Sequence, residues 1–124
     1  YKRYGYLALC ISGAGLHART VVKAEADNRP EMGQKITSRG TQLIRDFKGT
    51  KIAHYDKWDF SELPTAEPAD KELFTFLGNA LAKKTGGIDV GFGWNIKQAI
   101  KLDRAELLDA FRELEPLYRV IRSV

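Results

Sequence analysis

The spacing of apolar residues predicts two well-defined helices in the second half of the chain. The first covers residues 70–86, where apolar residues recur at steps of three and four and form one stripe. Asp70 is placed to cap its start, because an aspartate side chain accepts hydrogen bonds from the first amides of a helix. Gly86 and Gly87 are placed to end it. We therefore expect a helix that packs through its apolar stripe, which consists of Leu73, Phe74, Leu77, Ala80 and Leu81.

The second helix covers residues 103–122, and its apolar residues also recur at steps of three and four. Asp103 is placed as its cap, and Pro116 is expected to kink or divide it, because proline removes one backbone hydrogen bond. The stripe contains Leu107, Phe111, Leu114, Tyr118 and Ile121. We expect these two helices to pair and form the core, with Phe111 buried between them.

The remaining pattern is weaker and adds at most one pair of strands. Residues 88–94 alternate apolar side chains with aspartate and glycine, as a strand with one buried face does, and they are expected to pair with residues 52–55. Further helical segments are predicted at 19–27, 31–47 and 95–102, the last with Ile96 and Ile100 facing inward. The predicted fold class is thus mainly α: a small domain of four to five helices with possibly one short strand pair.

A separate apolar segment is predicted at residues 1–18. Tyr4 to Leu16 is a run of thirteen uncharged residues that follows Lys2 and Arg3. As a helix it would be about 20 Å long, short of the roughly 30 Å hydrocarbon core of a bilayer, so it is expected to dock on a membrane or on another subunit. The docking side chains would be Tyr6, Leu7, Leu9, Ile11 and Leu16. Residues 19–124 would form a single domain, with a proline-containing loop at 56–69.

Glycines in this segment also allow a third interpretation, a dinucleotide-binding fragment, in which residues 6–11 form a buried strand that runs into a glycine turn and then a helix from Ala18. Gly13-Ala14-Gly15 begins a G-x-G-x-x-A pattern that ends at Ala18, and such glycines let a backbone approach a pyrophosphate. A dinucleotide-binding domain needs a second buried parallel strand soon afterwards, but residues 24–40 are too polar to supply it. This interpretation therefore ranks last.

The charge of the chain is unevenly distributed. The net charge is +4, but residues 1–57 carry a balance of +6 and residues 58–124 a balance of −2. A basic region of this kind suits anionic headgroups, nucleic acid or an acidic partner subunit. The side chains of a basic patch would be Lys35, Arg39, Arg45, Lys48 and Lys51. A solvated helix face explains such a pattern more often than phosphate contacts do.

The sequence contains few residues with catalytic or metal-binding chemistry. Its single cysteine, Cys10, excludes an internal disulfide, and two histidines, His17 and His54, do not form a metal site by spacing. His54 precedes Asp56 by two residues, but no motif marks a nucleophile for the pair. We therefore expect no enzymatic activity, no metal and no cofactor.

Together these patterns predict a non-enzymatic accessory or structural subunit of a larger, membrane-associated protein assembly. Its partners would be other protein subunits, with possible membrane contact through the apolar segment. The first alternative is a nucleic-acid-binding subunit that uses the basic half of the chain. The second is the dinucleotide-binding fragment described above.

Overall fold

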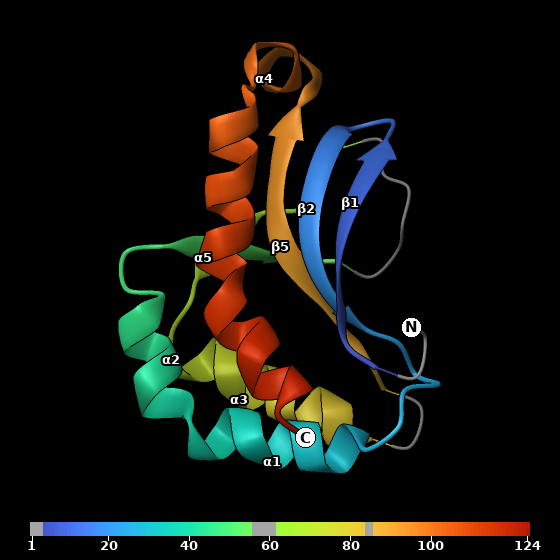
Figure 1. Cartoon of the computed structure of the whole chain (residues 1–124), viewed down its shortest axis with the longest axis vertical. Coiled ribbons are helices and arrows are strands. Elements are labelled where there is room, and N and C mark those ends of the chain that lie inside the picture. The colour runs from blue at the N-terminus through green and yellow to red at the C-terminus, as the bar shows by residue number, and fades with distance from the viewer. Residues whose placement is uncertain (1–3, 56–61, 84–85) are drawn as a thin grey trace.

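The structure, a computed structural model that describes residues 4–55, 62–83 and 86–124, has a mixed α/β fold. Figure 1 shows an antiparallel sheet with a long helix lying across it and further helices packed below. The expectation of a mainly α fold is therefore wrong. The strands are β1 (Tyr6–Ser12), β2 (Gly15–Val22), β3 (Lys51–His54), β4 (Ala66–Pro68) and β5 (Ile88–Asn95). Their order in the sheet is β1-β2-β5-β3-β4.

The helices largely follow the apolar periodicity. They are α1 (Arg29–Ser38), α2 (Gly40–Asp46), α3 (Lys71–Ala82), α4 (Ile96–Lys101) and α5 (Arg104–Arg122). Both predicted aspartate caps are confirmed: Asp70 accepts a hydrogen bond from the Leu73 amide at 3.3 Å, and Asp103 accepts one from Glu106 at 2.8 Å. Pro116 lies inside a continuous α5 and does not divide it.

The N-terminal part of the chain forms a β-hairpin, not a docking helix. β1 pairs with β2 in antiparallel register from Tyr6↔Val21 to Ser12↔Gly15, and the predicted helix at 19–27 is not formed, since residues 19–22 belong to strand β2 and residues 23–27 are turn or coil. The proposed dinucleotide motif lies in the turn of this hairpin. Gly15 has a φ of 143°, and a Cβ there would clash with the carbonyl oxygen of Trp94 in β5. This glycine thus serves the packing of neighbouring strands.

The predicted pairing of residues 52–55 with 88–94 is confirmed, since β3 pairs with β5 at Ala53↔Gly91 and His54↔Val90. The region predicted as a loop at 56–69 contains β4, which pairs with β3. Residues 56–61 of that region lie outside the described residues.

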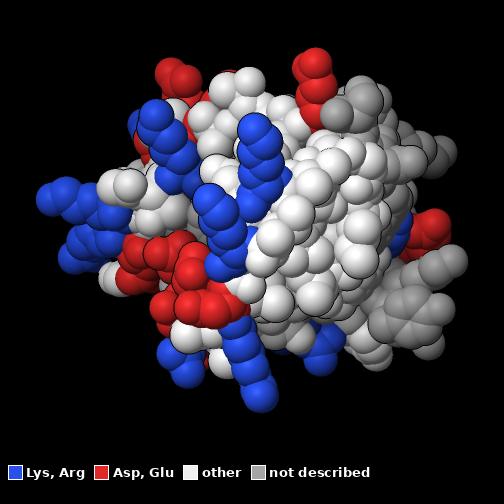
Figure 2. Space-filling model, turned by 90° about the horizontal axis from the view of Figure 1, so that it is seen from above, with Lys and Arg blue, Asp and Glu red and all other residues white. Residues whose placement is uncertain are grey.

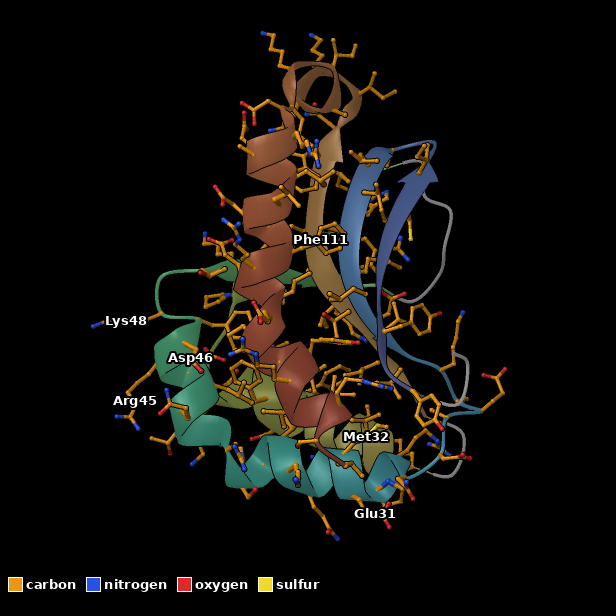
Figure 3. All side chains as sticks on the ribbon, viewed as in Figure 1. Glu31, Met32, Arg45, Asp46, Lys48 and Phe111 are labelled. Carbon is orange, nitrogen blue, oxygen red and sulfur yellow. The ribbon has the colours of Figure 1, made fainter. Side chains whose placement is uncertain are left out.

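The core lies between the helices and one face of the sheet. The sheet contributes the buried side chains Ala18, Val22, Ile88 and Val90, and the helices contribute Ile36, Leu77, Leu81, Leu114 and Leu117. Below the sheet, α1 and α3 pack closely, since a Cβ on Gly33 would lie 2.6 Å from the carbonyl oxygen of Gly78. Figure 3 shows Phe111 between α5 and the sheet. Phe111 is only partly buried, so the expectation of full burial is wrong.

We expect Leu114→Ala to lower the free energy of unfolding by about 2–5 kcal/mol, because Leu114 is fully buried and its truncation leaves a cavity. Phe111→Ala should cost less than the roughly 3–5 kcal/mol that full burial would imply. Urea unfolding of both variants measures the difference. A larger loss for Phe111→Ala than for Leu114→Ala would contradict this packing.

Candidate functional site

The two edges of the sheet differ in how well they are protected against pairing with other strands. β4 has only three residues, among them Glu67 and Pro68, and short length, charge and proline all discourage the addition of a strand. β1 has seven residues, YLALCIS, with neither charge nor proline. Within the described part of the chain, β1 pairs only with β2. β1 is therefore the edge that can accept another strand.

The predicted docking residues fall on both faces of this hairpin. Leu7, Leu9, Ile11 and Leu16 share the face that also carries the core residue Ala18, because Leu9 is opposite Ala18 and Ile11 is opposite Leu16. Tyr6 points to the other face. Leu7 packs against the core, whereas Leu9 is 52 % exposed and Ile11 is 84 % exposed. The structure thus leaves apolar side chains of β1 accessible to a partner.

Exposed apolar residues continue onto α4 at the same end of the molecule. Ile96 is 59 % exposed and Ile100 is 79 % exposed, so the prediction that they face inward is wrong. We refer to Leu9, Ile11, Ile96 and Ile100 together as the apolar end. In the view onto the α4 end (Figure 2), charged side chains concentrate on the left, and a broad uncharged area occupies the centre right. Exposed apolar surface of this kind commonly marks an interaction site.

The residues of the predicted basic patch are not brought together. The Lys35 ammonium group lies 3.2 Å from the carbonyl oxygen of Ser123, beyond the end of α5. Lys51 lines a cavity with Glu106 near the start of α5, and Ser123 follows Glu106 by seventeen positions, which corresponds to about 25 Å of helix. Arg39 lies between α1 and α2, while Arg45 and Lys48 point outward at the far side of α2 (Figure 3). Nucleic-acid binding therefore stays a prediction.

The face of the sheet that points away from the helix-packed core carries a cluster of polar side chains. Ser12 Oγ lies 2.6 Å from His17 Nε2, and His17 Nδ1 lies 3.3 Å from the Tyr55 hydroxyl. The Arg19 guanidinium lies 3.9 Å from the centre of the Tyr55 ring and donates a hydrogen bond to Asp89 Oδ2 at 3.1 Å. His17 and Arg19 are fully buried. The cluster thus ties the β1–β2 hairpin to β5 and to the end of β3.

Burial sets the ionisation of this cluster. It raises the pKa of Asp89 to about 6, although the charge of Arg19 opposes that rise, and it raises the pKa of Tyr55 to about 12. Burial, together with the charge of Arg19, lowers the pKa of His17, which favours the neutral imidazole. At neutral pH the buried cation Arg19 therefore faces the Asp89 carboxylate.

The pairing of Ser12 with a neutral imidazole resembles the start of a nucleophilic site, because the imidazole can accept the hydroxyl proton. Acyl transfer also needs donors directed at a developing oxyanion. The Ala14 amide instead donates to Ser12 Oγ itself, at 3.1 Å. The described contacts thus use the serine to hold the turn of the hairpin, and they do not assemble a complete catalytic site.

The other chemically reactive residues do not form a site either. His54 points away from the cluster and stacks edge-on against Phe76, with 5.0 Å between ring centres, and its predicted partner Asp56 lies outside the described residues. Burial raises the pKa of the Cys10 thiol. Among residues 4–55, 62–83 and 86–124 there is no cluster of three potential metal ligands, and no helix there has the length and apolar character needed to cross a bilayer.

Comparison with known proteins adds no functional assignment. The sequence matches no protein-family model, and no curated protein is significantly similar to it.

The ionisation of Asp89 and His17 makes opposite contributions to the pH dependence of stability. The folded state raises the pKa of Asp89 from 3.8, so protonated Asp89 favours the folded state. This contribution to stability is present below pH 4 and is lost as the pH rises to about 6. The folded state lowers the pKa of His17 from 6.5, so neutral His17 favours the folded state. This contribution to stability is present above pH 6.5 and is lost as the pH falls below 6.5.

We expect Asp89→Asn to remove the contribution of Asp89 to the pH dependence of stability and to keep the contribution of His17. Between pH 6.5 and pH 4, the variant should therefore lose stability more steeply than the wild type as the pH falls. Urea midpoints measured across this range test the slope independently of the overall loss of stability that the variant will show. Parallel pH profiles for the two proteins would contradict the assignment.

Proposed function

We propose that this chain is a non-enzymatic interaction subunit of a larger protein assembly, and that an extended segment of another subunit adds to the outer edge of β1. The observation that supports this proposal is the character of β1: a seven-residue edge strand without charge or proline, with Leu9 and Ile11 exposed. Natural sheets rarely leave such an edge unprotected unless something pairs with it. Of the docking residues predicted from the sequence, the proposal uses Leu9 and Ile11, now as part of a strand.

Strand addition uses both the backbone and the side chains of β1. In an antiparallel or parallel pair, alternate residues direct their N–H and C=O groups towards the new strand, which gives affinity. Alternate side chains give specificity, and here they are Leu9 and Ile11 on the face that carries the apolar end. Covering a side chain such as Ile11 contributes about 1.5–3 kcal/mol. The fitting partner segment is therefore uncharged, with apolar residues at alternate positions.

A different subunit fits this edge better than a second copy of the chain. β1 itself is uncharged and offers no charge for recognition, but each copy carries a net charge of +4. Two copies paired through β1 would repel each other, whereas a neutral or acidic partner would not.

Leu9→Lys should detach the protein from its assembly, because it places an unpaired charge in the proposed interface. Phe76→Lys is the matched control: Phe76 is 47 % exposed on α3, far from β1 in the fold. The full-length chain, tagged and carrying a photo-crosslinker at position 11, would be purified from its native cells. We expect one partner to co-purify in a fixed ratio and to be crosslinked from position 11. Phe76→Lys should retain this partner, and Leu9→Lys should lose it.

Two results would overturn the proposal. One is that folded Leu9→Lys retains the partner at the wild-type level. The other is that crosslinks from position 11 reach only a second copy of this chain. Thermal unfolding of Leu9→Lys within about 2 °C of the wild type would show that the variant is folded, as expected for a substitution at an exposed position.

We infer further that the assembly is membrane-associated, with contact at the bilayer surface through α4. The specific observation is that the exposed side chains of Ile96 and Ile100 share this six-residue helix with Lys97 and Lys101. Apolar residues that enter the headgroup region beside lysines that attract anionic lipids are typical of interfacial helices.

We expect the protein to sediment with vesicles that contain anionic lipid at low salt and to be released as the salt concentration rises. The double variant Ile96→Ser/Ile100→Ser should lower the partition coefficient by about tenfold or more, because it removes two apolar side chains from the contact. Phe76→Ser serves as the control. Absence of sedimentation at low salt, or an unchanged coefficient for the double variant, would remove membrane contact from the proposal.

A further inference from the structure

A second binding region is suggested by a cavity of about 600 Å³ between α5, β5 and the β3–β4 pair. The cavity exists because β3 pairs with β5 over only a short length. Tyr55 N donates to the Asp89 carbonyl oxygen at 2.7 Å, and Ala53 is opposite Gly91, but Lys51 pairs only with Pro68 of β4. β3 therefore turns away from β5 beyond Gly91.

This divergence leaves backbone groups of β5 directed into the cavity. Alternate residues of an antiparallel strand direct their N–H and C=O groups to the same side. Since the Asp89 carbonyl points towards β3, the backbone groups of Gly91 and Gly93 point the same way. Gly91 is opposite Ala53, whereas Gly93 lines the cavity and has no strand partner on that side in the described part of the chain. Gly93 thus offers one donor and one acceptor to an extended ligand.

The helix side of the cavity is acidic. Glu106, Asp109 and Glu113 line it from α5, and their spacing of three and four residues places them on one helix face. Among the described residues that line the cavity, Lys51 is the one basic residue, so the charged groups of this described lining sum to −2. Arg112 lies 3.4 Å from Asp109, but both side chains are mostly exposed and the pair is therefore weak.

Aromatic side chains complete the lining. Tyr55, Phe92 and Trp94 contribute to the cavity wall. Aromatic rings attract ammonium and guanidinium groups and pack against the aliphatic stems that carry them. Carboxylates together with aromatic rings therefore suit a lysine or arginine side chain.

We propose that this cavity binds an extended peptide segment that carries lysine or arginine. The backbone of the segment pairs with Gly93, its cationic side chain lies beside Glu106 and Glu113, and its apolar stem contacts Phe92 and Trp94. The volume lies within the roughly 300–1,000 Å³ range of ligand pockets. The site is separate from the outer edge of β1, because β2 and β5 lie between that edge and the cavity in the sheet order. Peptide binding in the cavity therefore does not depend on the proposed docking function of β1.

Isothermal titration of the full chain with a blocked seven-residue peptide of alternating lysine and valine tests the proposal. We expect binding at low salt that weakens as salt rises, and no binding of the same peptide with glutamate in place of lysine. Glu106→Gln/Glu113→Gln should weaken binding by about tenfold, as expected for the loss of two exposed charge contacts. Glu115→Gln, a matched change on α5 outside the cavity lining, should change it by less than about twofold.

Two further titrations distinguish strand pairing from simple attraction of cations. A lysine–valine peptide methylated on every backbone nitrogen should bind much more weakly, because it has no backbone N–H group left to pair with a strand edge, and a linear tetra-amine of equal charge should also bind more weakly. Equal binding of either probe would overturn the peptide assignment. So would absence of lysine–valine binding at low salt, or an equal loss in Glu115→Gln.

Discussion

The pairing of β2 with β5 is the constraint on which the rest of the fold depends. Eight residues of each strand pair, from Gly15↔Asn95 to Val22↔Ile88, although the two strands are far apart in the sequence. The pair carries β1 on one side and β3 on the other. It also provides the surface that α5 covers, since Ala18, Val22 and Val90 belong to the same core as Leu114 and Leu117. The edge strand, the polar cluster and the cavity all take their positions from it.

The buried arginine helps to specify this pairing. Arg19 in β2 is fully buried and meets Asp89 in β5 diagonally, since Arg19 is opposite Gly91 and Asp89 is opposite Val21. A shift of one residue would turn Arg19 towards the apolar core and separate it from its carboxylate. A buried ion pair adds little net stability because desolvation opposes its attraction, so a role in fixing the register is the better physical explanation for its presence.

The sequence predicted the parts of this fold that local physics decides. The α3 and α5 helices follow from their stripes and aspartate caps, and β5 follows from its alternation of apolar residues with aspartate and glycine. β2 was missed because it is buried on both faces, with Ala18 towards the core and His17 and Arg19 in the polar cluster, so that its polar residues do not form the solvent-exposed face of a half-buried strand. The sequence did not predict that α1 starts at Arg29, where Pro30 lies in the first turn and its missing amide costs nothing.

The candidate sites were predictable only in part, since their positions depend on strand order. The exposed residues Leu9 and Ile11 were singled out as apolar contacts, but their place at a sheet edge follows from β1 being the outermost strand. The alternating polar residues His17 and Arg19 were the signal for the buried cluster. Their partners Tyr55 and Asp89 lie 38 and 70 residues away, and no local pattern connects them.

The long separation of β2 and β5 also sets the order of events while the chain is being made. The β1–β2 hairpin leaves the ribosome well before β5 is synthesised, so both of its edges are then exposed, and an isolated two-stranded hairpin is barely stable in water. Arg19 remains without Asp89 during this interval, and the hairpin cannot complete its polar cluster. The nascent chain therefore exposes two unpaired strand edges. One is the uncharged outer edge of β1, and the other is the edge of β2 that later pairs with β5. Only β5 removes the second edge, and the outer edge of β1 stays exposed.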